Sequence, residues 1–357
     1  MRVVLSGYYG FHNVGDEAIL ISIITALKKF KSDIEITVLS NDPDYTRETY
    51  EVDAVNRWDL KQVANVIKNS DGLISGGGSL LQDATSNKTV PYYTGVMFIA
   101  KMLKKPYFVY AQGMGPVNGK INQWLTKLAS NHAKLLTVRD EDSKLFLEKI
   151  GVKNKIDLVP DPVLGLNIPN CEYQWFENLG LTNQIITVSV RDWETGINFK
   201  EKIAKALNKL VEDGNEVILL PMHGKHDEET CKAIEKMMRE KVIIAPYDAT
   251  IEEKITIISK SVLLIGMRLH ALIFAAVSDV PFIALSYDPK IDAFSNLCNQ
   301  VVVGHVCHED WDDQTLFALS QKVMGSREDY VLSMKEYTNN SKLSAQLTAD
   351  KVITALS

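Results

Sequence analysis

The stretch 266–270, which reads Gly-Met-Arg-Leu-His, holds the side chains of this sequence that are best suited to bind a small anion and to move a proton. An apolar run before it predicts a buried strand, and the spacing of apolar residues over 269–278 predicts a helix after it. The N–H groups at a helix N-terminus attract anions, and Arg268 adds a planar fork of donors that fits a carboxylate or a phosphate. His270 adds a side chain that titrates near neutral pH. A lone histidine on a helix is usually a core or capping residue, but Arg268 beside it favours a substrate site, which Leu269 would line.

Two further cations, Arg139 and Lys290, follow predicted strands. Arg139 can bind a substrate anion or form a structural salt bridge with the acidic residues 140–142 that follow it, and the sequence leaves both open. Lys290 is expected to face the same site as Arg268, because the carboxyl ends of parallel strands meet at one edge of a sheet. Asp161 lies between two prolines after another strand and is either a turn residue or an active-site carboxylate.

Two glycine-rich turns also follow predicted strands. Residues 7–18 read Gly-Tyr-Tyr-Gly-Phe-His-Asn-Val-Gly-Asp-Glu-Ala, and residues 76–83 read Gly-Gly-Gly-Ser-Leu-Leu-Gln-Asp. Glycines let a backbone approach a ligand closely. The turns are therefore candidates for substrate binding, and the candidate residues are Asn13, Asp16, Gly77, Gly78 and Asp83. The structural alternatives are Asp16 as the N-cap of the next helix and a glycine run that packs against another part of the backbone.

His223, His226 and Asp227 lie close together after the predicted strand 216–220. Their H-x-x-H-D spacing lacks the helical geometry of known zinc-binding pairs. We therefore expect no metal site, and we expect His223 to contribute to substrate binding.

The elements that must position these residues alternate along the chain. Short runs of β-branched residues alternate with amphipathic segments, which is typical of a doubly wound parallel sheet. The alternation weakens between Pro160 and Asn183 and then begins again. The chain has 357 residues, 46% of them hydrophobic, which is enough for two cores. The sequence therefore predicts an α/β fold with two Rossmann-like domains facing a cleft, where ligands of such sheets bind.

The expected domain boundaries follow from the same alternation. The N-terminal domain is expected over 1–165, a linker over 166–183 and the C-terminal domain over 184–328. The closing segment, 329–357, is polar and helical and is expected to cross back to the N-terminal domain.

Composition argues against several classes of protein. The formal net charge of -6 argues against broad binding of nucleic acid. The four cysteines contain no C-x-x-C pair, so neither a zinc knuckle nor a disulfide framework is indicated. The sequence has no apolar run of about 18 residues and no signal-peptide pattern at its start. These features predict a cytoplasmic protein and leave attachment to a membrane surface open.

Taken together, the clusters resemble the polysaccharide pyruvyl transferase family. The resemblance rests on the turns at 7–18 and 76–83, on Val-Arg-Asp at 138–140 and on the 266–270 stretch, and it runs from residue 1 to about residue 305. Within the family, the sequence looks most like the bacterial enzyme of cell-surface anchoring. The resemblance implies a GT-B-like fold, which agrees with the two Rossmann-like domains expected from the alternation.

The resemblance also implies an activity, the transfer of a pyruvyl group from phosphoenolpyruvate to a sugar as a cyclic ketal. In the anchoring branch the acceptor looks to be a terminal β-linked N-acetylmannosamine of a lipid-linked secondary cell-wall polymer precursor, bridged at its 4- and 6-hydroxyls. The finished polymer anchors the S-layer. Phosphoenolpyruvate is a co-substrate, so no cofactor is implied. The implied partners are phosphoenolpyruvate and the lipid-linked saccharide, with peripheral contact at the cytoplasmic membrane face. The N-terminal domain is expected to bind the acceptor, and the C-terminal domain the donor.

These implications assign roles to the candidate residues. Arg139, Arg268 and Lys290 would neutralise the carboxylate and phosphate of the donor, and His270 is the preferred acid for C3, although a role as a base stays open. One alternative is a GT-B-type glycosyltransferase that uses a nucleotide sugar, but no clear acidic ribose-binding pair follows a strand of the second half. Another is a sugar-binding module without catalysis, which would not need His270.

Overall fold

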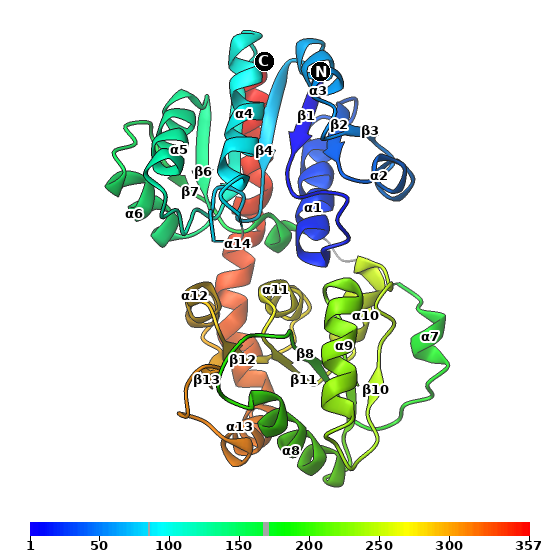
Figure 1. The fold of residues 1–357 in the computed structure, drawn as a ribbon. Coiled ribbons are helices and arrows are strands. Elements are labelled where there is room, and N and C mark those ends of the chain that lie inside the picture. Colours follow the sequence, from blue (N-terminus) through cyan, green and yellow to red (C-terminus); the bar gives the residue numbers. More distant parts are fainter. Residues whose placement is uncertain (85, 167–170) are drawn as a thin grey trace. The chain divides into compact units, whose positions relative to one another are not determined.

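The computed structural model describes residues 1–84, 86–166 and 171–357. It divides into two compact units (Figure 1). Unit 1 consists of Met1–Leu166 and Ser341–Ser357, and unit 2 of Asn167–Asn340. Each unit is built on one sheet of parallel strands, and helices connect successive strands.

The sheet of unit 1 has seven strands in the order β3-β2-β1-β4-β5-β6-β7. Their bounds are β1 (Arg2–Ser6), β2 (Glu35–Ser40), β3 (Asp53–Asn56), β4 (Gly72–Gly76), β5 (Tyr107–Gln112), β6 (Leu135–Val138) and β7 (Asp157–Leu158). β1 pairs in parallel with β2 on one side and with β4 on the other. The direction in which the chain adds strands therefore reverses between β1 and β4, and such a switch point is where open α/β sheets bind ligands.

The helices of unit 1 follow the strands in turn. They are α1 (Val14–Phe30), α2 (Pro43–Tyr50), α3 (Leu60–Lys68), α4 (Thr89–Met102), α5 (Lys120–His132) and α6 (Glu141–Lys149), with the short 3₁₀ helix η1 (Pro162–Gly165). Acidic residues in the first turn of α1 and lysines in its last turn complement the helix dipole. The side chain of Asn13 caps α1 by accepting from the N–H of Gly15. The structural alternative, in which Asp16 is the cap, is therefore wrong, because the helix begins earlier and Asp16 lies in its first turn.

The sheet of unit 2 has six strands in the order β10-β9-β8-β11-β12-β13. Their bounds are β8 (Ile185–Ser189), β9 (Glu216–Leu219), β10 (Ile243–Ile244), β11 (Leu263–Gly266), β12 (Phe282–Ser286) and β13 (Val301–His305). The connecting helices are α7 (Gln174–Glu177), α8 (Phe199–Glu212), α9 (Gly224–Glu235), α10 (Ile251–Ser259), α11 (Leu269–Val277), α12 (Pro289–Leu297) and α13 (Asp313–Gly325). The switch point of this sheet lies between β8 and β11, which pair in parallel.

The centre of each sheet is buried on both faces, so its strands are continuous apolar runs rather than alternating ones. Every residue of β8, β11 and β12 is buried. α11 is buried from Ala271 to Ala276, so its burial is wider than a single apolar stripe. The backbone that carries Arg268 and His270 is therefore held between a buried strand and a buried helix.

The segment expected as a linker differs in part from that expectation. Residues 167–170 lie outside the described residues, but 171–183 contain α7, where Tyr173 and Phe176 are buried. This helix is only four residues long, about one turn, which is too short to show a helical period in the sequence. The described part of this segment therefore contains helical structure with a packed side.

The closing helix α14 (Arg327–Leu356) contributes to both units. Its residues from Ser341 onward belong to unit 1, where Gln346 donates to the carbonyl of Gly165 at 2.8 Å and accepts from Lys29 at 2.7 Å. Its earlier residues belong to unit 2, where the Tyr330 carbonyl accepts from the Gln300 side chain at 3.0 Å.

Candidate functional site

In unit 2, Arg268 lies between β11 and α11 as the N-cap residue of that helix. Its Nε donates to Asp227 Oδ2 at 2.9 Å, and its Nη2 donates to Asp227 Oδ1, so the pair is bidentate. Asp227 is 1% exposed and also accepts from the N–H of Met222 at 3.1 Å. Asp227 comes from the first turn of α9, which follows β9. A planar guanidinium is therefore held rigidly at the switch point of the sheet, at the N-terminus of α11.

Two more basic side chains of this sheet, His223 and Arg191, follow β9 and β8, the strands that precede β11 in the sheet order. Burial is the main reason why the pKa of His223 lies below its usual value, and the charge of Arg268 lowers it further. Asp227 acts in the opposite direction, while His226 and Arg191 again lower this pKa. His223 directly precedes α9, while Arg191 and Arg268 follow β8 and β11, which pair in parallel. The site therefore combines two arginines with an imidazole that is neutral at pH 7.

Arg191 follows β8, on the other side of the switch point from Arg268. Its Nη1 donates to the Tyr287 hydroxyl at 3.3 Å, and its guanidinium carbon lies 5.1 Å and 5.0 Å from the ring centres of Trp193 and Tyr287. The sequence pattern showed that Arg191 ends a strand but did not single it out as a site residue. The reason is that its approach to Tyr287, 96 positions later, depends on the strand order.

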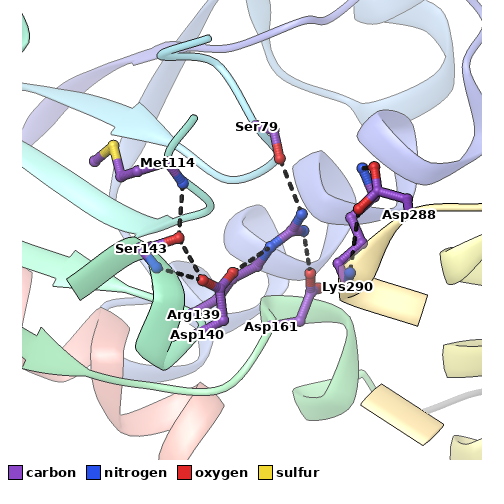
Figure 2. Close-up of polar contacts among 8 residues, drawn as sticks. All are labelled: Ser79, Met114, Arg139, Asp140, Ser143, Asp161, Asp288 and Lys290. Atoms are coloured by element: carbon purple, nitrogen blue, oxygen red, sulfur yellow. Dashed lines mark hydrogen bonds and ion pairs between the residues drawn. The ribbon is translucent and has the colours of Figure 1, made fainter. Parts of the chain in front are cut away.

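The remaining candidates of unit 2 lie on neighbouring elements. Leu269 and His270 are the first two residues of α11. Lys290 lies in the first turn of α12, after β12, the strand next to β11. Its Nζ lies 3.0 Å from Asp288 Oδ2, so this cation already has a carboxylate partner (Figure 2).

The H-x-x-H-D run is arranged around an arginine rather than around a metal ion. The carboxylate of Asp227 is occupied by Arg268 and Met222, and the rings of His223 and His226 have their centres 6.0 Å apart. In the part of the chain that the structure describes, no three His, Cys, Asp or Glu side chains form a group that could hold a metal ion.

In unit 1, Arg139 is surrounded by partners (Figure 2). Its Nη1 donates to Asp161 Oδ2 at 2.7 Å and its Nη2 to Ser79 Oγ at 3.2 Å, and only 8% of the side chain is exposed. Asp140 Oδ2 is farther away, 3.8 Å from Arg139 Nε, because Asp140 caps α6 instead. Asp140 directly follows Arg139 in the chain but makes the weaker contact. The close salt-bridge partner of Arg139 is Asp161.

The sequence left open whether Asp161 is a turn residue or an active-site carboxylate. The structure shows that it lies in a turn, and an active-site role stays a prediction. Its Oδ1 accepts from the N–H of Val163 at 3.1 Å, which makes it the cap of η1. Its other oxygen binds Arg139. It is therefore a turn residue that also fixes a candidate substrate-binding arginine.

The glycine run after β4 is explained first by packing. Gly77 and Gly78 have φ values of 59° and 68°, which favour glycine. A Cβ on Gly77 would lie 1.9 Å from Cγ2 of Ile19 on α1, and one on Gly78 would lie 2.8 Å from Oδ1 of Asp16. Close packing therefore accounts for Gly77, although against the Ile19 side chain rather than against another backbone segment, while Gly78 brings the backbone close to the Asp16 carboxylate.

Asp83 lies apart from these residues and fixes a loop. It accepts from the N–H groups of Asn118 and Gly119, both at 2.8 Å, and from Asn122 Nδ2 at 3.2 Å. These contacts join the loop after β4 to the start of α5. The position of Asp83 is thus explained by the fold, and its predicted role in binding stays a prediction.

Two buried charged residues of unit 1 were missed by sequence reasoning. Glu17 accepts from the N–H of Gly10 and from the Tyr50 hydroxyl, both at 2.8 Å, and so holds the turn after β1. Arg57, directly after β3, is 2% exposed and donates to the carbonyl of Gly7 at 2.7 Å. β3 is only four residues long and half polar, so no apolar run in the sequence indicates the strand that positions Arg57.

Lys254 of α10, in unit 2, is a third buried charged residue that sequence reasoning missed. It is 0% exposed, and its Nζ donates to the carbonyl of Tyr247 at 2.9 Å. Burial lowers the pKa of Lys254 from 10.5 to about 8, against the opposing charges of Asp248, Glu253 and Asp227. Because the folded protein binds this proton less well than the unfolded chain, the charge destabilises the fold below pH 8, and the cost disappears as the pH rises from about 8 to 10.5.

Lys254→Met is therefore expected to raise the free energy of unfolding at pH 7 by about 1–3 kcal/mol, since an apolar side chain of similar length carries no charge to bury. Urea unfolding at pH 7 and at pH 10 would measure the effect, which should shrink at the higher pH. Lys236→Met, at an exposed lysine of the same unit, is the control and should change little at either pH. A variant that is less stable than wild type at pH 7 would contradict the prediction.

With this geometry in place, comparison with known proteins identifies the family. The family model described as polysaccharide pyruvyl transferase matches residues 13–289, which is more than half of the chain. The chain belongs to the polysaccharide pyruvyl transferase family. It is a pyruvyl transferase enzyme, and the matched range includes the switch point of unit 2 and every candidate residue except Lys290.

A relative of this pyruvyl transferase acts in polysaccharide synthesis. The amylovoran biosynthesis protein AmsJ of Erwinia amylovora is 21% identical over 366 aligned positions, which cover 81% of this chain and 84% of AmsJ.

Solved structures show the fold of the pyruvyl transferase. UDP-GlcNAc 2-epimerase from Neisseria meningitidis, bound to UDP-GlcNAc, matches with a TM-score of 0.67 and 14% identity over 100% of this chain and 99% of its own. Anabaena HepE in complex with UDP-glucose matches with a TM-score of 0.66 and 12% identity over 99% of this chain and 100% of its own. At these identities the likeness concerns the fold alone, and it confirms the prediction of two Rossmann-like domains of GT-B type.

The structure also bears on membrane association in one respect. Among the described residues of the pyruvyl transferase, no helix combines the length and the apolar character that are needed to cross a bilayer.

Proposed function

We propose that this pyruvyl transferase moves the enolpyruvyl group of phosphoenolpyruvate onto a terminal β-N-acetylmannosamine and forms a 4,6-O-pyruvyl ketal. The observation that carries the proposal is the cluster at the switch point of unit 2. There Arg268, at the N-terminus of α11, is oriented by the buried Asp227, and Arg191 and His223 follow β8 and β9, the strands that precede β11 in the sheet order. A donor with a carboxylate and a phosphate matches two guanidinium groups and a helix N-terminus better than a neutral ligand does.

The proposed reaction balances in four steps. C3 of phosphoenolpyruvate gains a proton, which leaves C2 electron-poor, and the first sugar hydroxyl attacks C2 and loses its proton. The C2–O bond to phosphate then breaks, and the phosphate leaves with one proton. The second hydroxyl attacks C2, loses its proton and closes the ketal ring. His270 is proposed as the acid for C3, and Arg268 with Arg191 would stabilise the departing phosphate. Arg139 and Lys290 are proposed as further cations for the donor, following the family resemblance.

The remaining parts of the proposal concern the acceptor and its location. We propose that unit 1 binds the acceptor and that Asn13, Asp16, Gly78 and Asp83 lie in its binding region. The acceptor is proposed to be a lipid-linked precursor of a secondary cell-wall polymer, as in the S-layer-anchoring branch that the sequence resembles. An enzyme acting on it would work in the cytoplasm, with peripheral contact at the membrane face.

Phosphate release provides the direct test. With phosphoenolpyruvate and a panel of β-linked N-acetylhexosamine glycosides, phosphate should appear only with acceptors that carry both free hydroxyls, and N-acetylmannosamine should be the best of them. Acceptors lacking the 4- or the 6-hydroxyl are the matched controls and should yield no ketal by mass spectrometry. Transfer of a sugar from a UDP-sugar, without use of phosphoenolpyruvate, would instead establish the glycosyltransferase alternative.

Chelation should leave the proposed activity largely intact. Asp227, the carboxylate of the only sequence run that suggested a metal, has both oxygens occupied by Arg268 and Met222. Phosphate release would be measured after treatment with EDTA and removal of the chelator. Complete loss of activity that one divalent ion restores would contradict this expectation and would direct attention back to His223 and His226.

A further inference from the structure

An aromatic cluster in unit 1 surrounds the buried Arg57 and has no part in the donor chemistry described above. It lies at the carboxyl ends of β1 and β3 and at the start of α4. The guanidinium carbon of Arg57 lies 5.2 Å, 5.1 Å, 4.4 Å and 5.4 Å from the ring centres of Phe11, Trp58, Tyr92 and Tyr93. Arginine held against aromatic faces gains cation–π energy, and the gain increases where water is excluded.

Arg57 is fixed by neutral acceptors. Its Nη1 donates to the carbonyl of Gly7 and its Nη2 to the Tyr93 hydroxyl at 3.2 Å, and the Tyr92 hydroxyl donates to the Arg57 carbonyl at 3.0 Å. Its Nε is buried and makes no hydrogen bond within the described residues. A buried guanidinium with so few acceptors costs free energy, so the rings around it must contribute to holding it in place.

Trp58 is the exposed member of the cluster. It is 58% exposed, yet its indole Nε1 donates to Asn41 Oδ1 at 2.9 Å and its backbone N–H donates to Asn56 Oδ1 at 2.9 Å. Asn41 in turn donates to the carbonyl of Gly10, in the turn after β1. The ring of Trp58 lies 5.3 Å from that of Tyr92 at an angle of 51°. A large apolar face is therefore both accessible and immobilised, so little side-chain entropy would be lost when a ligand covers it.

We propose that Trp58 and Tyr92 form the stacking face of a subsite for a pyranose ring of the saccharide acceptor, with Arg57 as the positioning residue beneath them. This proposal rests on the proposed function in one respect, namely that the acceptor is a glycan. A pyranose ring presents C–H groups on its faces and hydroxyls at its edge. That pattern matches an exposed aromatic face bordered by the amides of Asn41 and Asn56. The subsite would hold the glycan at the carboxyl end of the unit 1 sheet, where ligands of such sheets bind.

The test compares two tryptophans of equal exposure. Trp58→Ala and Trp124→Ala remove side chains of the same unit that are 58% and 59% exposed. With a disaccharide that ends in β-linked N-acetylmannosamine, Trp58→Ala should raise the KM for the acceptor about 10-fold to 100-fold, as the loss of a central aromatic contact does. The KM for phosphoenolpyruvate should change by no more than about twofold, Trp124→Ala should match wild type, and Trp58→Phe should recover part of the loss.

Direct binding separates this proposal from the proposed function. Calorimetric titration of the disaccharide, without phosphoenolpyruvate, should show the same loss of affinity in Trp58→Ala and none in Trp124→Ala. If the disaccharide binds through Trp58 but no phosphate is ever released, the subsite stands and the proposed reaction fails. The proposed subsite is overturned if phosphate is released and the Trp58→Ala variant has a normal KM for the acceptor. Circular dichroism would show that this variant is folded. Weaker binding of UMP in Trp58→Ala, with the disaccharide unaffected, would make the surface a nucleobase site and would also overturn it.

Discussion

His270→Gln is expected to lower turnover by about 10²–10⁴-fold, the range that loss of a general acid produces. Glutamine keeps a hydrogen-bonding side chain of similar size but cannot give up a proton at neutral pH. The fold should survive, because His270 is the second residue of α11 and the buried run of that helix begins at the next residue, Ala271. The rate of phosphate release under saturating substrates is the measurement. In heavy water, the ketal methyl group formed by wild type should contain deuterium.

The control for this prediction is His308→Gln, which changes an exposed histidine of the same unit and should leave turnover unaffected. A His270→Gln enzyme that keeps more than about a tenth of the wild-type rate would show that His270 is not the general acid. The structure then narrows the choice of residues that could serve as the general acid. Asp83 accepts three hydrogen bonds and Asp161 binds Arg139, so Asp16 and His223 become the next candidates. Since the pKa of His223 is lowered from 6.5, a role of His223 as the acid would make the rate fall as the pH rises through a value below 6.5.

Arg268→Ala is expected to weaken phosphoenolpyruvate binding and, separately, to destabilise unit 2. The loss of a charge-assisted contact with the donor costs about 1.5–3 kcal/mol, or roughly 10-fold to 150-fold in the KM for the donor. The same change leaves the carboxylate of Asp227, 1% exposed, without its arginine, which costs about 3–5 kcal/mol of stability. Arg268→Lys should rescue little of either effect, because an ammonium group lacks the planar fork.

A double-mutant cycle separates the two effects. Asp227→Ala and Arg268→Ala should each lower the free energy of unfolding, and the double variant should lose much less than the sum, because it leaves no unpaired buried charge. The KM for phosphoenolpyruvate should stay high in the double variant, since the donor ligand is still missing. Recovery of both stability and donor KM in the double variant would mean that Arg268 serves only to neutralise Asp227. Arg139→Ala should likewise raise the donor KM, and a normal KM in both arginine variants would refute the assignment of the two arginines.

Local sequence patterns were sufficient for much of the fold. β9 differs by one residue from the predicted strand, 216–220, and α11 differs by one residue from the predicted helix, 269–278, because apolar runs bounded by turns mark buried strands and the apolar spacing marks the helix. β3 was missed because it is short and partly polar. Arg57 and Trp58, which follow β3, were missed for the same reason. Asp16 was an alternative candidate for the helix cap because it is acidic and lies near the helix start, but Asn13 three residues earlier serves instead.

The sequence by itself determined which residue types follow each strand, and so which side chains could meet at the carboxyl ends of the sheets. It could not determine which of them pair. The bond between Arg268 and Asp227 joins residues 41 positions apart, the bond between Arg139 and Asp161 joins residues 22 apart, and the cluster around Arg57 draws on two turns and the start of α4. Strand order decides which of these side chains come into contact, and strand order results from packing among elements that are distant in the chain. Only the tertiary structure could therefore turn an apparent metal motif into the anchor of an arginine, and an unremarked Asn-Arg-Trp sequence into an aromatic surface.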